Sequence, residues 1–188
     1  MPEVAESRLI LVQAARQRDH HAWNQLLKEH EAPLYVYIAE LIRDENAALD
    51  LIQEVFAGAV RHIGSLRDDA KFGSWLFAIA HQRCVQHWRN RQRDQRVFAE
   101  TDGGDEDDLG GTEPDDPRSL LVRKEQSEEF HALVSRLPEP QRAVLLLRTL
   151  EGFSLEEIAE VIGAPLGTVK SRLHHATQAL KRLAPSQP

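Results

Sequence analysis

The residues best suited to chemistry in this sequence are cations and hydroxyls gathered near its C-terminus. They are Thr168, Lys170, Ser171, Arg172 and His175. Lys and Arg side chains pair with phosphates, while Arg, Ser and Thr also donate hydrogen bonds to base edges. A helix face that meets only solvent would more often include Glu. The group therefore predicts a contact with nucleic acid.

A helix-turn-helix is the element that would present this group. Ser154 and Glu157 have the spacing of a capping box, in which each side chain bonds the other residue's backbone and fixes a helix start. Ala159, Gly163 and Val169 follow with helix-turn-helix spacing: a small residue at the crossing, a turn, and an apolar residue that closes a small core. We expect the second helix over about residues 166–183. An ordinary helical hairpin with a glycine turn is the alternative.

Helical periodicity extends over the rest of the chain, and no run alternates as a strand would. Asp19 is a candidate N-cap, and Pro33 is expected to interrupt the chain before a helix over 34–42. A longer helix is expected over 47–62, with Leu49, Ile52, Val55, Phe56 and Ala59 on its buried stripe. After a loop over 64–70, another helix should carry Phe72 and Trp75. These patterns predict an all-α fold.

Charge is divided unevenly along the 188 residues, whose formal net charge is -7. Acidic residues crowd positions 100–116, which include four Gly and one Pro but no Lys or Arg. A basic run precedes them and consists of Arg89, Arg91, Arg93 and Arg96. We predict two small helical domains, over 1–96 and 118–188, joined by a flexible acidic linker over 97–117.

Several classes of protein are disfavoured. No apolar run approaches the roughly 20 residues of a membrane helix, and the first residues lack the layout of a secretory signal, so a cytoplasmic protein without membrane insertion is expected. We find no glycine-rich phosphate loop, nucleophile elbow or paired carboxylates, so no enzyme activity and no cofactor are predicted. His81, Cys84 and His87 offer nitrogen and sulfur ligands, but their spacing drifts around a helix and no fourth ligand is evident. We therefore predict no metal site.

Two segments resemble one known family. The segment from Leu137 to Leu180 resembles region 4 of the extracytoplasmic-function sigma factors, the smallest members of the primary-sigma family. The segments Leu49 to Ile63 and Phe72 to Cys84 resemble region 2 of the same proteins. The resemblance implies a factor that binds core RNA polymerase and directs promoter-specific initiation. Region 2 would open and read the minus-10 element of promoter DNA, and region 4 would read the minus-35 element.

The resemblance also implies roles for residues in the first domain. Polymerase binding would fall to Asp50, Leu51, Gln53 and Glu54, although a merely solvated helix face is the alternative for each. Contact with the minus-10 strand would fall to the loop over 64–70 and to Lys71, Arg83, Gln86, Arg89 and Arg91. Gln82 and Gln86 stand where relatives often carry Asn and Asp, so a different downstream preference is expected. Phe72 and Trp75 would either stack on bases or, as their place on the apolar stripe favours, pack in the core. For Trp88 the sequence favours neither role.

In the second domain, the resemblance assigns the minus-35 element to Thr168, Lys170, Ser171, Arg172 and His175. Relatives often have Arg where His175 and Thr177 stand, so phosphate affinity should be lower here or depend on pH at His175. The acidic linker is either a mimic of nucleic acid on the polymerase or a spacer. Because the tail after Leu183 is too short for a regulatory domain, a separate anti-sigma factor is the expected control. A stand-alone helix-turn-helix regulator with an N-terminal sensing module is the rival, and it would bind DNA without polymerase.

Overall fold

The computed structural model describes residues 2–98 and 131–183, and every regular element within these ranges is helical. The first domain contains the helices α1 (Pro2–Arg16), α2 (His20–Ile42), α3 (Glu45–His62) and α4 (Phe72–Phe98), with the short 3-10 helices η1 (Ile63–Ser65) and η2 (Asp69–Lys71) between α3 and α4. The second domain contains α6 (Glu139–Leu150), α7 (Leu155–Ile162) and α8 (Leu166–Leu183). The predicted all-α fold is confirmed.

Side-chain caps fix several helix starts. The Asp19 carboxylate accepts hydrogen bonds from the backbone nitrogens of His21 and Ala22 at the start of α2. The capping box predicted at α7 is present, because Ser154 Oγ accepts from the Glu157 nitrogen and the Glu157 carboxylate accepts from the Ser154 nitrogen. These bonds satisfy backbone donors that the first turn of a helix leaves without partners.

One expected helix boundary is wrong. The sequence suggested a break at Pro33, yet α2 continues through this residue from His20 to Ile42. A proline inside a helix removes one backbone hydrogen bond and costs about 3 kcal/mol. Leu26 lies before Pro33 and Leu34 after it, and both are fully buried in the same core. Burial of large apolar side chains on both sides outweighs the local cost and keeps the helix in one piece.

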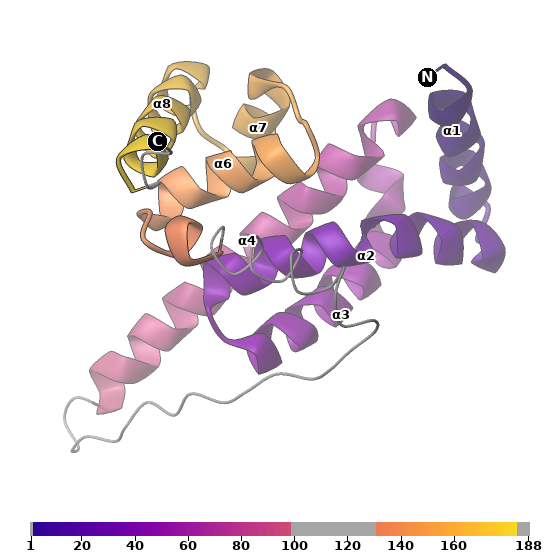
Figure 1. Ribbon diagram of the computed structural model, residues 1–188. Coiled ribbons are helices and arrows are strands. Elements are labelled where there is room, and N and C mark those ends of the chain that lie inside the picture. Colours follow the sequence, from indigo (N-terminus) through magenta and orange to yellow (C-terminus); the bar gives the residue numbers. More distant parts are fainter. Residues whose placement is uncertain (1, 99–130, 184–188) are drawn as a thin grey trace, which may run out of the picture.

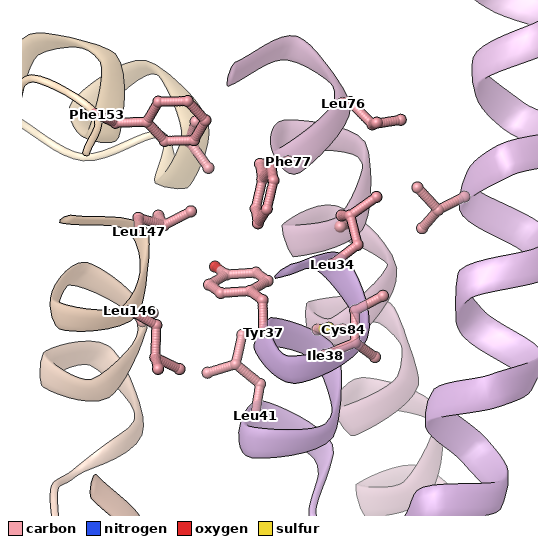
Figure 2. Close-up of a cluster of buried hydrophobic side chains, with 14 of the residues drawn as sticks. Leu34, Tyr37, Ile38, Leu41, Leu76, Phe77, Cys84, Leu146, Leu147 and Phe153 are labelled. Carbon is pink, nitrogen blue, oxygen red and sulfur yellow. The ribbon is translucent and has the colours of Figure 1, made fainter. Parts of the chain in front are cut away.

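The two domains pack against each other along α4 with α7 and along α2 with α6. Figure 1 shows α6, α7 and α8 gathered beside α2 and α4, away from α1. Aromatic rings connect the two sides: Tyr37 of α2 meets Phe77 of α4 at 5.4 Å between ring centroids, and Phe77 meets Phe153 of the second domain at 5.5 Å. Figure 2 shows Phe77 between Tyr37 and Phe153, with Leu146 and Leu147 of α6 nearby. In the described residues, the two domains therefore share one hydrophobic core.

The expected linker over 97–117 falls almost entirely outside the described residues; its first two positions end α4. The helix expected between Pro117 and Pro138 also lies mainly outside them, and its described part is helical over 131–135. The loop expected over 64–70 contains parts of both η1 and η2. Helix α4 runs from Phe72 into the basic run, as predicted.

Candidate nucleic-acid and polymerase interfaces

Helices α7 and α8 form a helix-turn-helix around one left-handed glycine. Gly163 has φ 62°, and its backbone nitrogen donates to the Ala159 oxygen, which closes α7. The nitrogens of Thr168 and Val169 then donate to the Pro165 oxygen at the start of α8. Val169 and Ala176 are fully buried on the inner face of α8. The turn and the small core are thus those that the spacing predicted.

The outer face of α8 carries most of the residues predicted to contact the minus-35 element. Lys170, Ser171 and His175 are exposed, and Thr168 is half-buried. Ser171 Oγ donates to the Thr168 backbone oxygen at 3.0 Å, so this hydroxyl keeps an acceptor position for a partner. The geometry places three groups with different hydrogen-bonding chemistry on one solvent-facing helix surface.

Arg172, like Thr168, is half-buried, and its charge acts on residues near the domain boundary. Burial, together with a smaller contribution from the positive charge of Arg172, lowers the pKa of His81 in α4 to about 4. Burial also raises the pKa of Glu139, while Arg142 and Arg172 oppose this change. Arg172, the main candidate in the sequence for reading a base, therefore interacts electrostatically with the His81 imidazole and the Glu139 carboxylate.

A hollow of about 620 Å³ lies between α3 and α4, beside the loop that joins them. Its walls are Gly58, His62, Ser65, Trp75, Ala78, Ile79, Gln82, Arg83 and Gln86. Trp75 Nε1 donates to Ser65 Oγ across 3.3 Å, which fixes the indole against the loop. Ser65 Oγ in turn donates to the His62 backbone oxygen. The hollow combines an aromatic face, a cation and two amides, which are the groups that hold an unstacked base.

The apolar stripe favoured core positions for both Phe72 and Trp75, but the structure separates the two residues. Phe72 is fully buried and contacts the rings of Trp23 and His30, so it belongs to the core. Trp75 is half-buried, its ring lies 5.8 Å from that of Phe72, and it lines the hollow. Trp88 is half-buried and packs against the core.

The predicted minus-10 cations are not grouped into one free patch. The Lys71 ammonium lies 2.9 Å from both carboxylate oxygens of Glu160 in α7, and this hydrogen bond is the main reason why the pKa of Lys71 is raised. Arg83 Nη1 lies 3.5 Å from Glu54 Oε2. Arg89 and Arg91 are exposed further along α4, and Gln86 donates to Asn90. Lys71 is thus engaged by the second domain, and Arg83 joins the hollow to α3.

The outer face of α3 differs from the prediction at two residues. Asp50, Gln53 and Glu54 are exposed as expected for polymerase contacts, but Leu51 is only 7% exposed and packs into the core. Leu49, which the sequence placed on the buried stripe, is 52% exposed. The helix is rotated relative to the expected stripe because Ala48, Leu51, Ile52, Val55 and Ala59 supply its core contacts. Val60 is also exposed, so this face is apolar as well as acidic.

Two of the three residues that suggested a metal site, His81 and Cys84, have other surroundings. His81 Nδ1 is 2.9 Å from the Tyr37 hydroxyl. Cys84 is fully buried, and burial raises the pKa of its thiol to about 12. A thiol in that state is a core side chain, because the thiolate that binds metals is suppressed. Within the described ranges, no cluster of three His, Cys, Asp or Glu residues is placed to hold a metal ion.

Two contacts carry no local sequence signal. Phe153 reaches the first domain, and Arg16 of α1 binds the loop between α3 and α4. Both join residues far apart in the chain, so neither periodicity nor a short motif could reveal them. Among the described helices, none is long and apolar enough to cross a membrane.

Comparison with known proteins relates both domains to one family. Residues 26–94 match the family Sigma-70 region 2, and residues 127–180 match Sigma-70, region 4. The RNA polymerase sigma-H factor of Pseudomonas aeruginosa is 34% identical over 175 residues, which cover 92% of this chain and 91% of that protein. The chain belongs to the sigma-70 family, in its extracytoplasmic-function group.

Further relatives of this sigma factor support the same group. The ECF RNA polymerase sigma-E factor of Escherichia coli strain K12 is 28% identical over 175 residues, covering 91% of each chain. The ECF RNA polymerase sigma factor SigW of Bacillus subtilis is 26% identical over 174 residues, covering 91% of this chain and 93% of that protein. Like these relatives, the protein is an RNA polymerase sigma factor that directs promoter-specific transcription initiation.

Solved structures show that the fold is shared as well. The sigma factor RpoE of Bartonella quintana, solved with the anti-sigma factor NepR, has a TM-score of 0.67 at 23% identity, covering 85% of this chain and 94% of that one. CnrH, solved with the cytosolic domain of CnrY, has a TM-score of 0.64 at 21% identity, covering 94% of this sigma factor and 96% of that chain.

Proposed function

We propose that this sigma factor divides promoter reading between two surfaces, with α8 on the duplex of the minus-35 element and the hollow beside α4 on the unpaired strand of the minus-10 element. The observation that carries this proposal is the hollow between α3 and α4. Trp75 offers a stacking face, Gln82 and Gln86 offer amides for a base edge, and Arg83 offers a cation for the backbone. This combination suits a base that has left the double helix.

The duplex-reading surface is the exposed face of α8. Thr168, Lys170, Ser171 and His175 supply phosphate and base contacts there, and Arg172 joins them when the domains separate. Arg89 and Arg91 extend the cationic surface of α4 beyond the hollow and follow the strand backbone. Lys71 contributes at the other end once it leaves Glu160.

Polymerase binding falls to the exposed face of α3. Asp50, Gln53 and Glu54 supply acidic and amide groups, which complement a basic partner surface. The exposed side chains of Leu49 and Val60 add apolar area to the same helix. A partner that covers them gains hydrophobic as well as electrostatic free energy.

The domain limits 1–96 and 118–188 remain part of the proposal, with residues 97–117 as linker. The two surfaces must reach separate promoter elements, and one turn of duplex is about 34 to 36 Å long. Lys71 is paired with Glu160 of the second domain and Arg172 is half-buried in the packed chain, so the packed arrangement is the form in which DNA is not engaged. Mounting on polymerase separates the domains.

The packed boundary between the domains includes an unfavourable free-energy contribution, which is relieved when the domains separate. Arg142 of α6 is 4% exposed, and its Nε and Nη1 atoms have no hydrogen-bond partner among the described residues. Burial lowers the pKa of this guanidinium, with Arg43 adding to the effect. A buried, incompletely paired cation is costly and regains water on opening.

A separate anti-sigma factor is the proposed regulator of this protein. The solved sigma factor RpoE is complexed with NepR, which is named an anti-sigma factor, and CnrH, whose fold is also similar, is complexed with the cytosolic domain of CnrY. A partner that holds α7 against α4 would keep Lys71 and Arg172 from DNA. The acidic linker is proposed to act either as a spacer or as a nucleic-acid mimic on the polymerase.

A gel-shift experiment with and without core RNA polymerase tests this function. The protein is expected to bind core polymerase and to shift promoter DNA only in that complex. A shift of similar strength by the protein alone would favour the stand-alone regulator instead.

Replacing the acidic residues of 100–116 with Ser and Asn tests the role of the linker. If the linker mimics nucleic acid, polymerase binding should weaken and binding to free DNA should strengthen. If it is only a spacer, neither should change.

A further inference from the structure

Arg16, in the last turn of α1, contacts the α3–α4 loop at three places. Its Nε donates to Asp69 Oδ1 at 2.9 Å, and its Nη1 donates to the Ile63 oxygen at 3.2 Å. Its Nη2 donates to the Leu66 oxygen and lies 2.8 Å from Asp69 Oδ1. The acceptors come from η1, from η2 and from the residue that follows η1. One guanidinium therefore binds both ends of the loop and its middle.

This loop forms one wall of the hollow. His62 and Ser65 line the cavity at the start of the loop, and Trp75 of α4 is hydrogen-bonded to Ser65. Lys71 ends η2 at the other end of the loop. Leu66 is 5% exposed and anchors the middle of the loop in the core. A shift of the loop would therefore move the wall of the hollow, the Trp75 contact and the Lys71 cation together.

The chemistry of arginine suits this task. A guanidinium carries five donors in a fixed planar fork, so it holds several acceptors in a defined arrangement. Two of the acceptors are backbone carbonyls of the loop. The Ile63 oxygen already accepts from the Leu66 nitrogen and gains a second bond from Arg16, while the Leu66 oxygen accepts from Arg16 at the end of η1. Lysine would supply a single mobile charge instead. The Arg16 side chain is 30% exposed and that of Asp69 is 20% exposed, so the ion pair is partly shielded from water.

We propose that Arg16 is a positioning residue for minus-10 strand capture: it holds the loop over 63–71 in the shape that the unpaired strand meets. This inference rests on the proposed function of the hollow. Arg16 itself lies behind the loop and acts through it. The alternative is that Arg16 only stabilises the C-terminal end of α1 through its charge. That role would need only a positive charge. Arg16→Lys separates the two roles because it keeps the charge and removes the fork.

Arg8 provides a matched control on the same helix. Its Nε pairs with Glu29 Oε2 at 3.3 Å, with both side chains more than 40% exposed, and this pair joins α1 to α2 without touching the loop. Figure 1 shows α1 well separated from α8, so neither substitution reaches the duplex-reading surface. Arg8→Ala therefore removes an α1 cation of the same type while leaving the loop and both DNA surfaces intact.

The test uses the full chain bound to core polymerase and a fluorescent single-stranded oligonucleotide that carries the minus-10 sequence. Arg16→Ala and Arg16→Lys are expected to weaken capture of this strand about tenfold, since a displaced wall loses most of a well-oriented contact. Affinity for core polymerase and for minus-35 duplex should stay at wild-type values, and Arg8→Ala should match wild type throughout. Wild-type capture by Arg16→Lys would overturn the proposal, as would an equal loss of polymerase binding.

Hydrogen exchange supplies a second measurement that does not depend on DNA. Amides over 63–71 should exchange faster in Arg16→Lys than in wild type or Arg8→Ala, while amides of α2 and α4 keep their protection. Unchanged exchange in the loop would contradict the proposal even if strand capture fell. If the wild-type complex captures no strand at all, the proposed function of the hollow fails, and the exchange measurement still decides whether Arg16 holds the loop.

Discussion

The cations differ in their hydrogen-bond and ion-pair partners. This difference separates those proposed to contact DNA from Arg16, which is proposed to position the loop. Lys71 and Arg83 are paired with exposed carboxylates of Glu160 and Glu54. Exposed pairs of this kind contribute about 0 to 1 kcal/mol, so DNA phosphates can displace the carboxylates at little cost. Arg16 is held by two carbonyls and a partly shielded carboxylate, and it stays in place. The hydrogen-bond and ion-pair partners of each cation, more than its charge, therefore decide whether it is available to bind DNA.

His30 predicts a pH dependence of stability. It is 2% exposed, and its ring lies 5.6 Å from that of Phe72. Burial lowers its pKa to about 4, Arg8 adds to this effect and Glu29 opposes it. A depressed histidine pKa means that the unfolded chain takes up the proton first. Stability is therefore complete above about pH 6.5 and falls as pH drops towards 4.

His30→Leu should remove much of this loss. The His30 contribution is about 3 kcal/mol over the window, because each pKa unit corresponds to about 1.4 kcal/mol. Denaturant unfolding at pH 7 and pH 4.5 measures it, with the exposed residue His20 replaced by Leu as a control. The pKa of His81 is also lowered to about 4, so part of the pH dependence of the unfolding free energy should remain in His30→Leu. An unchanged slope in His30→Leu would show that this imidazole does not govern acid stability.

At the scale of elements, local signals predicted what local interactions determine. The capping box of Ser154 and Glu157, the left-handed Gly163 and the inner position of Val169 all occur as predicted, because each depends on residues within one turn or one hairpin. The predicted helix break at Pro33 and the predicted burial of Leu49 were wrong, because packing between residues far apart in the chain decides both. The contacts of Arg16 and Phe153 join separate helices, so no pattern within one helix encodes them.

Pro33 in α2 also offers a test of the balance between local cost and packing. Alanine at this position would restore a backbone donor inside the helix, and the local conformation is already helical. Pro33→Ala is therefore expected to raise the free energy of unfolding by about 1 to 3 kcal/mol. Circular dichroism during thermal unfolding measures the change. A lower melting temperature would mean that the proline makes packing contacts worth more than the lost hydrogen bond.

At the scale of the whole molecule, the packed domains should open when the contact around Phe153 is disturbed. A Cβ atom at Gly73, the second residue of α4, would lie 3.3 Å from His30 Nε2 and 3.7 Å from the Phe153 ring. Gly73→Leu places a side chain into this contact and should push α7 away from α4. Gly167 is the second residue of α8 and has open space at its Cβ, so Gly167→Leu is the matched control.

Energy transfer between dyes on Glu45→Cys and Thr177→Cys reports the distance between the domains. Both positions are exposed, whereas the native Cys84 is buried and its thiol has a pKa of about 12, so labelling is selective. Gly73→Leu should lower the transfer efficiency, and Gly167→Leu should leave it unchanged. Equal efficiencies in all three proteins would show that this contact does not hold the domains together.

One chain, mounted on core RNA polymerase, is proposed to read two promoter elements with two surfaces. Run-off transcription from a randomised promoter library is the decisive experiment. We expect two enriched elements. Arg172→Ala should relax only the upstream one and cost about 1 to 3 kcal/mol if Arg172 reads a guanine, and Arg83→Ala should affect only the downstream one. Transcripts without sequence enrichment, or an upstream element that survives Arg172→Ala while the downstream one is lost, would contradict this proposal.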